Sequence, residues 1–363
     1  SEKELYNDQS PPNASPLFHE GIVYVHTPQY LIAVDAGSGE ILWKHDLSGK
    51  FGKMVDLFTG FSAPVEADGR IVISYGKARK GQFELVAFDP GGEVLWTHTE
   101  EKGASKGFAV SMASPTYGVV DGKPTIVLSM GHGTVGIDPD SGERLWTFRH
   151  EKEFPKLLES TASLNKETGE ISTPGAWWEN YGQTAPAALI SEDGIVVDRV
   201  WSGHGTRGSR MYGFEVRDGQ PVLLWDAPEL LNRWDPGVIY QGKYFGIDMR
   251  GDTHTNNVEY PRLPRAKDLG QLQCYNLKNG ELLFSSNELP QNAGLYEGPP
   301  RKGKSRLTNE LWSNWSEILK ESIYSYGGGP SFTIAGDTLV LRGNQQSGSG
   351  LFFARITDDG LQR

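Results

Sequence analysis

Cysteine is almost missing from this chain of 363 residues, in which Cys274 is the single one. One cysteine excludes disulfides within the chain, zinc sites built from several cysteines, and haem attachment through a Cys-x-x-Cys-His motif. The sequence also lacks any apolar run of about 20 residues, which a transmembrane helix would need. No transmembrane segment is therefore expected.

Positive charge is also scarce, because 35 Lys and Arg stand against 46 Asp and Glu, for a net charge of −11. Proteins that bind nucleic acid depend on Lys and Arg contacts to phosphates, so no nucleic-acid partner is expected. The sequence contains no Gly-rich phosphate loop, no nucleophile elbow and no His-Glu-x-x-His zinc motif. These absences leave the common motif-based enzyme classes without support.

Glycine, proline and aromatic residues are abundant, with 45 Gly, 21 Pro and ten Trp. Hydrophobic residues make up 37% of the chain, which is enough to bury a sizeable core and argues against disorder. The many Gly and Pro residues indicate frequent tight turns.

One motif recurs and decides the architecture. It reads Leu-Ile-Ala-Val-Asp-Ala-Gly-Ser-Gly-Glu-Ile-Leu-Trp at 31–43, with close copies at 85–96 and 134–146. Looser copies lie at 211–225, at 272–284 and from 351 onward. Each copy predicts a β-hairpin, because a short apolar strand runs into Asp or Asn, a Gly permits the turn, and a second strand follows. The Trp that ends each close copy is expected to pack between neighbouring sheets.

A second motif precedes each hairpin and consists of a Pro, an apolar strand, a turn and another apolar strand. Its prolines are Pro16, Pro64, Pro115, Pro186, Pro236 and Pro330. The two motifs together form six units of four short strands. Such units, repeated about every 50 residues, predict an all-β fold, a β-propeller of four-stranded antiparallel blades. Six blades are recognisable; a seventh hidden in an insertion, and two stacked β-sandwiches, remain as alternatives.

The pattern Ala-x-Asp-x-x-Ser/Thr-Gly-x-x-x-Trp resembles the pyrroloquinoline-quinone-type (PQQ-like) propeller repeat. That repeat occurs in quinoprotein alcohol dehydrogenases, in the scaffold lipoprotein of outer-membrane β-barrel assembly, and in secreted bacterial propellers without a known ligand. The first three copies match it closely and the others loosely, and together they cover nearly the whole chain. The resemblance implies a fold far more specifically than a function.

We expect one propeller domain over residues 1–363, and a monomer. Three insertions interrupt it, at about 151–182, 256–269 and 287–327, and the apolar spacing at 311–319 predicts one short helix. The last unit is expected to end at Arg363 without a fourth strand. Residues 3–7 would then supply that strand and close the ring.

A polar pocket is predicted where the loops between the second and third strands of the units converge near the axis. Its candidate catalytic residues are Tyr75, His132, His204 and Arg207, and its candidate ligand-binding residues are His26, Trp177, Trp178, Tyr181, Asp252, His254, Arg342 and Asn344. Arg binds carboxylates bidentately, and His serves as donor, base or metal ligand. The expected ligand is an anionic small molecule or an oligosaccharide. Turn sequences inherited by repeat duplication, and a Trp pair that packs the insertion onto the propeller, are the purely structural alternatives.

Four functions stay open, and whether the protein is an enzyme is among the open questions. The first is the ligand-binding propeller just described. The second is a polysaccharide-active enzyme. As a lyase, it would use His or Tyr to remove the C5 proton of a uronic acid and Arg to neutralise the carboxylate. As a hydrolase, it would use a divalent metal held by histidines and Asp252. The third is a PQQ-dependent dehydrogenase, which is less favoured because the resemblance implies an adjacent cysteine pair that one cysteine cannot form. PQQ is therefore not the expected cofactor. The fourth is a non-catalytic protein-interaction scaffold.

The first residues, 1–4, contain neither an initiator Met nor the apolar segment of a signal peptide. We therefore expect that the numbering starts inside a longer precursor from which a targeting segment has been removed. A periplasmic or extracellular location is the corresponding prediction.

Overall fold

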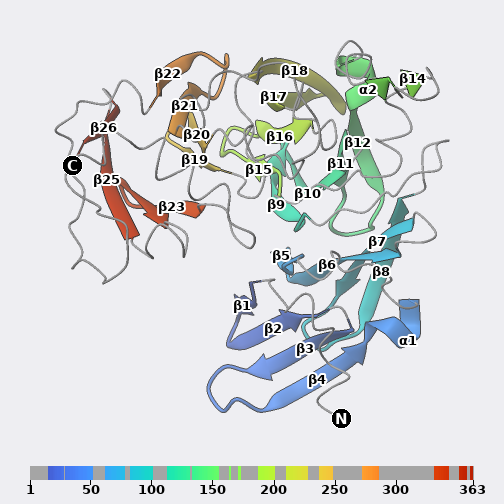
Figure 1. The fold of residues 1–363 in the computed structure, drawn as a ribbon. Coiled ribbons are helices and arrows are strands. Elements are labelled where there is room, and N and C mark those ends of the chain that lie inside the picture. Colours follow the sequence, from blue (N-terminus) through green and yellow to red (C-terminus); the bar gives the residue numbers. More distant parts are fainter. Residues whose placement is uncertain are drawn as a thin grey trace. The chain divides into compact units, whose positions relative to one another are not determined.

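The computed structural model places strands almost wherever the repeat predicts them (Figure 1). It describes residues 15–27, 29–51, 62–77, 82–100, 113–130, 133–154, 163–164, 171–172, 187–200, 210–227, 237–247, 272–285, 331–342, 351–357 and 360–362. Within these residues the chain forms six four-stranded antiparallel sheets, one for each predicted unit. The prediction of six four-stranded units is thereby confirmed.

The first three sheets follow one another along the chain. Sheet 1 contains β1 (Leu17–His19), β2 (Ile22–His26), β3 (Tyr30–Asp35) and β4 (Ile41–Asp46); sheet 2 contains β5 (Val65–Ala67), β6 (Arg70–Lys77), β7 (Gln82–Phe88) and β8 (Val94–Glu100); sheet 3 contains β9 (Thr116–Val120), β10 (Lys123–Met130), β11 (Gly133–Ile137) and β12 (Arg144–Arg149). Two short helices, α1 (Leu47–Phe51) and α2 (His150–Glu153), follow the last strands of sheets 1 and 3.

The remaining sheets repeat the same order. Sheet 4 contains β15 (Leu189–Ile190), β16 (Val196–Val200), β17 (Arg210–Arg217) and β18 (Gln220–Ala227); sheet 5 contains β19 (Val238–Tyr240), β20 (Lys243–Ile247), β21 (Leu272–Asn276) and β22 (Leu282–Ser285); sheet 6 contains β23 (Ser331–Ala335), β24 (Thr338–Arg342), β25 (Leu351–Thr357) and β26 (Gly360–Gln362). A two-stranded sheet of β13 (Ser163–Leu164) and β14 (Ile171–Ser172) lies in the insertion predicted at 151–182.

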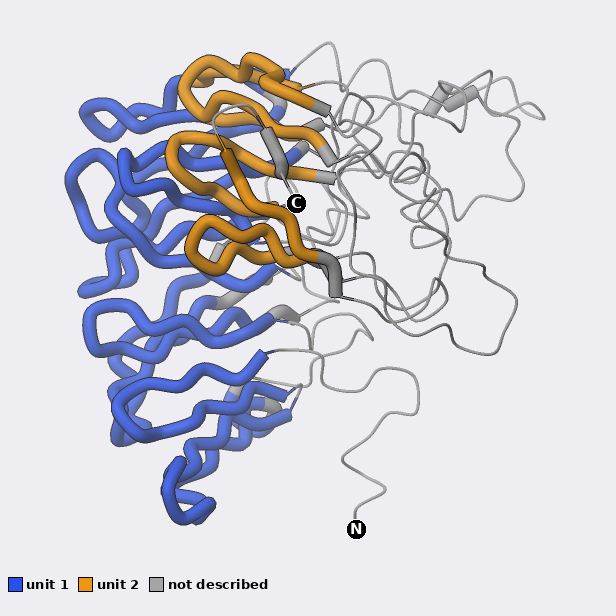
Figure 2. Tube along the Cα trace, turned by 90° about the vertical axis from the view of Figure 1, so that its left-hand side faces the viewer, with its two compact units in different colours: residues 1–203, 214–222 blue, residues 204–213, 223–363 orange. Residues whose placement is uncertain are grey.

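The chain divides into two compact units, of residues 1–203 with 214–222 and of residues 204–213 with 223–363 (Figure 2). In the first unit, the first strands of successive sheets are in contact: β1 with β5, β5 with β9, and β9 with β15. In the second unit β19 contacts β23 in the same way. Within each unit the sheets therefore follow one another through their first strands, as the blades of a propeller do around its axis.

The strand order gives each sheet two different ends. The connections between the first and second strands, and between the third and fourth, lie at one end, which we call the turn end. The connections between the second and third strands, and the links from one sheet to the next, lie at the opposite end, which we call the loop end. The strand order therefore assigns the predicted insertions at 151–182, 256–269 and 287–327 to loop-end connections.

Apolar side chains fill the space between successive sheets of the first unit. Tyr24, Leu31 and Ala33 of sheet 1 pack against Ile71 and Phe88 of sheet 2, and all five are fully buried. A second cluster joins the opposite face of sheet 2 to sheet 3 through residues such as Leu85 and Ile137. Both faces of sheet 2 are thus buried, which explains why β6 and β7 read as almost continuous apolar runs.

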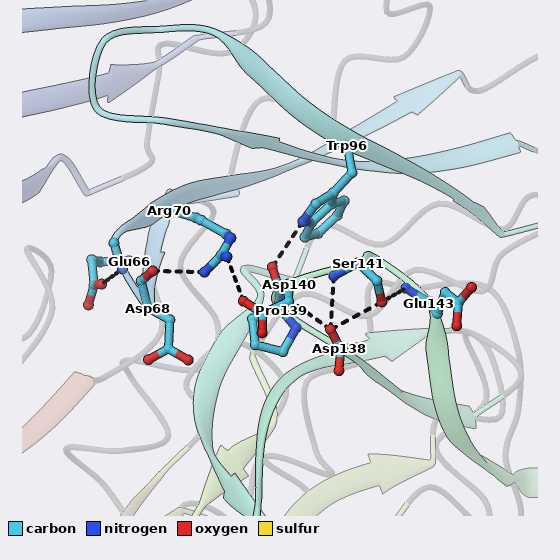
Figure 3. Close-up of polar contacts among 10 residues, drawn as sticks. Glu66, Asp68, Arg70, Trp96, Asp138, Pro139, Asp140, Ser141 and Glu143 are labelled. Atoms are coloured by element: carbon cyan, nitrogen blue, oxygen red, sulfur yellow. Dashed lines mark hydrogen bonds and ion pairs between the residues drawn. The ribbon is translucent and has the colours of Figure 1, made fainter.

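A tryptophan on the outer strand fastens each of several sheets to the turn of the following sheet. Trp43 donates its Nε1–H to the Pro90 carbonyl at 2.9 Å, and Trp96 donates to the Pro139 carbonyl at the same distance. Figure 3 shows the second of these contacts beside the Asp138 turn. Trp225 repeats it with the Leu277 carbonyl at 2.7 Å. We call this contact the Trp–turn lock, and it confirms the prediction that these tryptophans pack between sheets.

The turn that receives the tryptophan is shaped by an aspartate. Asp138 Oδ1 accepts the backbone N–H groups of Asp140 and Ser141, at 2.8 and 2.9 Å, and also the Ser141 hydroxyl at 3.1 Å. Asp35 makes the same bonds in sheet 1. In Figure 3, Arg70 from the turn end of sheet 2 reaches Asp140, with 2.5 Å between the charged atoms. Asp140 is largely exposed, so this ion pair contributes little on its own.

Sheet 4 departs from the pattern because its last hairpin turns through only Asp218 and Gly219. Its turn therefore lacks the segment that carries the receiving carbonyl in sheets 2, 3 and 5. Correspondingly, Trp146 Nε1 is buried without a hydrogen-bond partner among the described residues. The Trp146 ring instead meets Phe214 edge-on, with 5.6 Å between the ring centroids.

Sheet 6 corrects one prediction. Its fourth strand is β26, which pairs with β25 through Arg355 and Gln362, Ile356 and Leu361, and Thr357 and Gly360. The expectation that the last unit ends without a fourth strand was therefore wrong, because a chain segment of three residues suffices for this short outer strand. Residues 3–7 and the helix predicted at 311–319 lie outside the described residues.

The glycine that ends each turn gives a first test of the lock. Gly142 has φ +73°, and an added Cβ would lie 2.6 Å from Cε3 of Trp96, whereas Gly39 has φ +76° with nothing within 4 Å. Gly39→Ala should cost about 1–2 kcal/mol of backbone strain. Gly142→Ala should cost about 1–3 kcal/mol more, because the alanine also displaces Trp96. Urea denaturation of both variants checks this, and equal losses would show that the indole contact is not tight.

The indole hydrogen bond can be tested separately. Trp96→Phe removes the bond to the Pro139 carbonyl, whereas Trp146→Phe removes a donor that has no described partner. Trp96→Phe should therefore cost about 1 kcal/mol more than Trp146→Phe. Replacement of either residue by Ala should cost about 3–5 kcal/mol, as for other large aromatic side chains. The free energy of unfolding is the readout, and a larger loss for Trp146→Phe would contradict the assignment.

Candidate functional site

The loop end of the first unit contains a row of buried polar side chains between the sheets. Three of them, His26, Ser74 and Ser129, occupy equivalent places near the ends of the second strands. The registers show the equivalence, because the residues three positions earlier pair with Val34, Phe88 and Ile137, each of which directly precedes a turn aspartate. Exposure of the three side chains is at most 2%.

Each member of the row reaches toward the following sheet. His26 Nδ1 lies 2.8 Å from the carbonyl of Ser62, which precedes sheet 2. The Ser74 hydroxyl donates to Ser62 Oγ at 2.5 Å and lies 3.5 Å from the Ala113 carbonyl, which precedes sheet 3. The Ala63 N–H donates to Ser114 Oγ at 2.8 Å. These contacts connect the loop ends of sheets 1, 2 and 3 through hydrogen bonds.

A buried carboxylate continues the row between sheets 3 and 4. Asp198 of β16 accepts the Ser129 hydroxyl on Oδ1 at 2.8 Å and the Thr134 hydroxyl on Oδ2 at 2.6 Å. Its Oδ1 also accepts the Arg199 backbone N–H at 2.8 Å. Ser129 and Thr134 are directly opposite each other on β10 and β11, so the hairpin presents both hydroxyls together.

Burial shifts two protonation equilibria in this row. Burial lowers the pKa of His26 from its ordinary 6.5 to about 4, although the bond to the Ser62 carbonyl acts in the opposite direction. Burial also raises the pKa of the Asp198 carboxyl, against the hydrogen bonds from Thr134 and Ser129 that favour its charged form. At neutral pH His26 is therefore an uncharged donor and acceptor.

The row can act as a rigid polar base beneath the loop-end connections. Its hydroxyl, imidazole and carboxylate groups are fixed by inter-sheet hydrogen bonds rather than free to bind solvent. Within the described part of the chain, no group of three or more His, Cys, Asp or Glu side chains is arranged to hold a metal ion. The described members of the row therefore join neighbouring sheets at this end.

Of the predicted pocket residues, two have described side chains. His26 ends β2 in the buried row, and Tyr75 of β6 is fully buried in the apolar cluster between sheets 1 and 2. Arg342 is the last residue of β24, and its backbone alone is described. The others, His132, Trp177, Trp178, Tyr181, His204, Arg207, Asp252, His254 and Asn344, lie outside the described residues.

Sequence reasoning missed several members of the row, namely Ser62, Ser74, Ser129, Thr134 and Asp198. A signal existed, because Asp198 and Arg199 interrupt the apolar run Ile-Val-Val at 195–197, and charged residues in a buried strand need partners. A serine near the end of the second strand also occurs in both the second and the third unit, as Ser74 and Ser129. Pairing across sheets could not be read from the sequence, because it joins residues 36 to 69 positions apart.

Comparison with known proteins supports the fold. Residues 7–150 match the family model described as outer membrane protein assembly factor BamB. The crystal structure of BamB from Moraxella catarrhalis is similar over 96% of this chain and 86% of its own, with 14% identity and a TM-score of 0.50. At this identity the likeness shows the β-propeller fold and nothing more specific. No match was found among curated proteins.

Two further solved structures are more distant. A europium-containing methanol dehydrogenase is similar over 91% of this chain and 72% of its own, with 10% identity and a TM-score of 0.41. A protein of unknown function from Bacteroides caccae is similar over 73% of this chain and 77% of its own, with 9% identity and a TM-score of 0.36. Neither likeness is close enough to bear on function.

One feature that the resemblance to quinoprotein dehydrogenases implies is missing from the sequence. The resemblance implies an adjacent cysteine pair, but Cys274 is the chain's single cysteine and lies buried in β21. Burial raises its thiol pKa to about 12, so it is an inert core residue. We derive no reaction step through PQQ. Among the described helices, none is long and apolar enough to cross a membrane.

Asp198 provides a test of the buried row. Asp198→Leu leaves the Ser129 and Thr134 hydroxyls and the Arg199 N–H without their acceptor, and should cost about 2–4 kcal/mol. Asp198→Asn keeps an acceptor and removes the charge. Because the folded pKa of Asp198 is raised, the ionised carboxylate becomes unfavourable as pH rises, so the Asn variant should gain stability relative to wild type above about pH 4. Denaturation from pH 4 to pH 8 measures both effects, and a relative loss for Asn with rising pH would contradict the buried-charge assignment.

Proposed function

Residues 7–150 match a family of PQQ-like β-propeller repeats, and from this premise we propose that the chain is a binding scaffold of the bacterial cell envelope. It holds a protein partner at the loop ends of its sheets and works outside the cytoplasm, in the periplasm or beyond. The main support is the match of residues 7–150 to a family described as an outer membrane protein assembly factor.

The two ends of the sheets differ in structure, and the difference favours the loop end as the binding surface. At the turn end, short turns are fixed by aspartate caps and by the Trp–turn lock, and therefore serve the framework. At the loop end, the connections vary in length, and the described strand ends beside them carry the buried polar row. Variable connections held by a rigid framework are the usual position of binding residues. One domain over residues 1–363, with its insertions at this end, fits the proposal.

Site-specific photocrosslinking in the native host tests this function. A benzophenone amino acid replaces Gln29 or Lys152, which lie at the loop end, or Glu93 or Glu192, which are exposed at the turn end. We expect discrete adducts with one envelope protein from the loop-end positions and much weaker ones from the turn-end controls. Equal adducts from both ends, or none from either, would contradict the scaffold proposal.

A polar ligand pocket at the same end is the second candidate function. The observation that favours it is the position of His26, one of the predicted pocket residues, at the loop end of sheet 1. His132, His204, Arg207 and Asp252 would supply the recognition of an anionic or carbohydrate ligand, with Arg binding a carboxylate bidentately. A lyase reaction would use the same residues as base and charge neutraliser.

Thermal-shift measurements separate this candidate from the scaffold. Uronic-acid oligosaccharides, Ca²⁺, Zn²⁺ and PQQ are each added to wild type and to a His132→Ala, His204→Ala double variant. Recognition of a ligand in the pocket predicts a shift for wild type that the double variant loses. No shift with any compound leaves the scaffold as the single proposal.

A further inference from the structure

We propose that His26 is an acid-sensitive device that loosens the loop-end seam between sheets 1 and 2 when the pH falls. The seam consists of His26 at the end of β2, the Ser62 carbonyl, and Ser74 on β6. This property lies in the fold itself and does not depend on which partner or ligand the protein binds.

Among the described residues, the geometry provides no hydrogen-bond acceptor for a second proton on the imidazole. Nδ1 lies 2.8 Å from the Ser62 carbonyl, which can only accept, so Nδ1 carries the proton of the neutral ring. Nε2 then holds a lone pair, is buried, and has no hydrogen-bond partner among the described residues. The whole side chain is 2% exposed. A proton on Nε2 would create a buried cation whose new N–H has no described acceptor.

The elements around His26 offer little compensation for such a charge. Leu31 faces it directly across the β2–β3 pairing, and Leu31 belongs to the buried apolar cluster. The described titratable groups on β2, β3, β4, α1 and β6 near this end are Tyr24, Tyr30, Lys44, His45, Asp46, Lys50 and Tyr75. Asp46 is the single carboxylate among them; it is exposed, and its Oδ1 accepts the Gly49 N–H at 3.0 Å.

The low pKa that burial gives His26 agrees with this geometry and fixes the direction of the effect. In the closed seam the pKa is about 4, and in an opened seam it returns to the ordinary 6.5. Above about pH 7.5 both states are neutral and the seam has its full stability. As pH falls from 6.5 toward 4, the open state takes up the proton first, so closure weakens. At pH 5 the open state gains about 30-fold relative to neutral pH.

The hydrogen bonds beyond His26 carry the effect across the loop end. The Ser62 carbonyl that His26 holds belongs to the same residue whose hydroxyl accepts the Ser74 hydroxyl at 2.5 Å. Ser74 in turn lies 3.5 Å from the Ala113 carbonyl before sheet 3. Release of Ser62 by His26 therefore frees the entry to sheet 2. At the turn end the Trp43 contact includes a second histidine, because His45 Nε2 lies 2.5 Å from the Gly92 carbonyl, so the His26→Asn variant is needed to separate the two.

The test combines a titration with hydrogen exchange on the full chain. Histidine labelled with ¹³C at Cε1 reports the pKa of His26 by NMR, with His26→Asn assigning the signal. Exchange of peptides covering residues 22–31 and 62–75 is compared at pH 5 and pH 7.5, after correction for intrinsic rates, with peptides from 126–137 as the internal reference.

The two variants differ in one histidine each. In His26→Asn, the Asn side chain keeps a donor for the Ser62 carbonyl but cannot be protonated. His19→Asn is the matched control, because His19 is a partly exposed histidine of the same sheet.

We expect His26 to titrate below pH 5, and its two seam peptides to open about 30-fold more at pH 5 than at pH 7.5 in wild type and in His19→Asn. The His26→Asn variant should lose this pH dependence. Titration of His26 near 6.5 would overturn the proposal, as would equal acid opening in wild type and His26→Asn. If His26→Asn does not fold, variants of the other seven histidines assign the His26 signal by elimination. The titration and the hydrogen exchange of the wild type then test the proposal by themselves.

Discussion

The contact between an outer-strand tryptophan and the turn of the following sheet is the constraint on which the rest of the structure depends. Four-stranded sheets of this size are too short to be stable alone, so each must bury its faces against a neighbour. The Trp–turn lock determines where that neighbour sits, because the indole both covers the turn glycine and donates to a turn carbonyl. A sheet held at its turn end leaves the connections at its loop end free to vary.

This constraint explains why the structure of the turn end could be predicted from the sequence. Asp at the start of the turn, Gly at its end and Trp after it each have a stereochemical task, and the three occur together in the first three units. The strands, their order and the number of four-stranded units could therefore be predicted from the sequence alone. Sheet 4 follows the same topology without the lock at Trp146, because apolar packing onto Phe214 takes its place.

The loop end was predictable in position but not in detail. Strand order requires that His26 and Ser74 lie at this end, and the sequence predicted His26 as one of its ligand-binding residues. It assigned His26 to a ligand, whereas the structure shows that one ring nitrogen is used by the Ser62 carbonyl of the next sheet. The role of Asp198 was missed, since its partners Ser129 and Thr134 lie more than 60 positions away. Contacts of that kind follow from sheet-to-sheet packing, which local patterns do not specify. Tyr75 was predicted as a candidate catalytic residue, but its side chain lies fully buried between sheets 1 and 2.

The proposed function separates a framework end of the sheets from a binding end, and a footprint of the complex tests that separation most directly. The partner captured by crosslinking would be purified with the protein, and hydroxyl-radical oxidation of the complex compared with that of the free protein. The account predicts that partner-dependent protection falls on the connections at 47–51, 101–112 and 150–162. Protection confined to the turns at 36–40, 90–93 and 139–143 would contradict it.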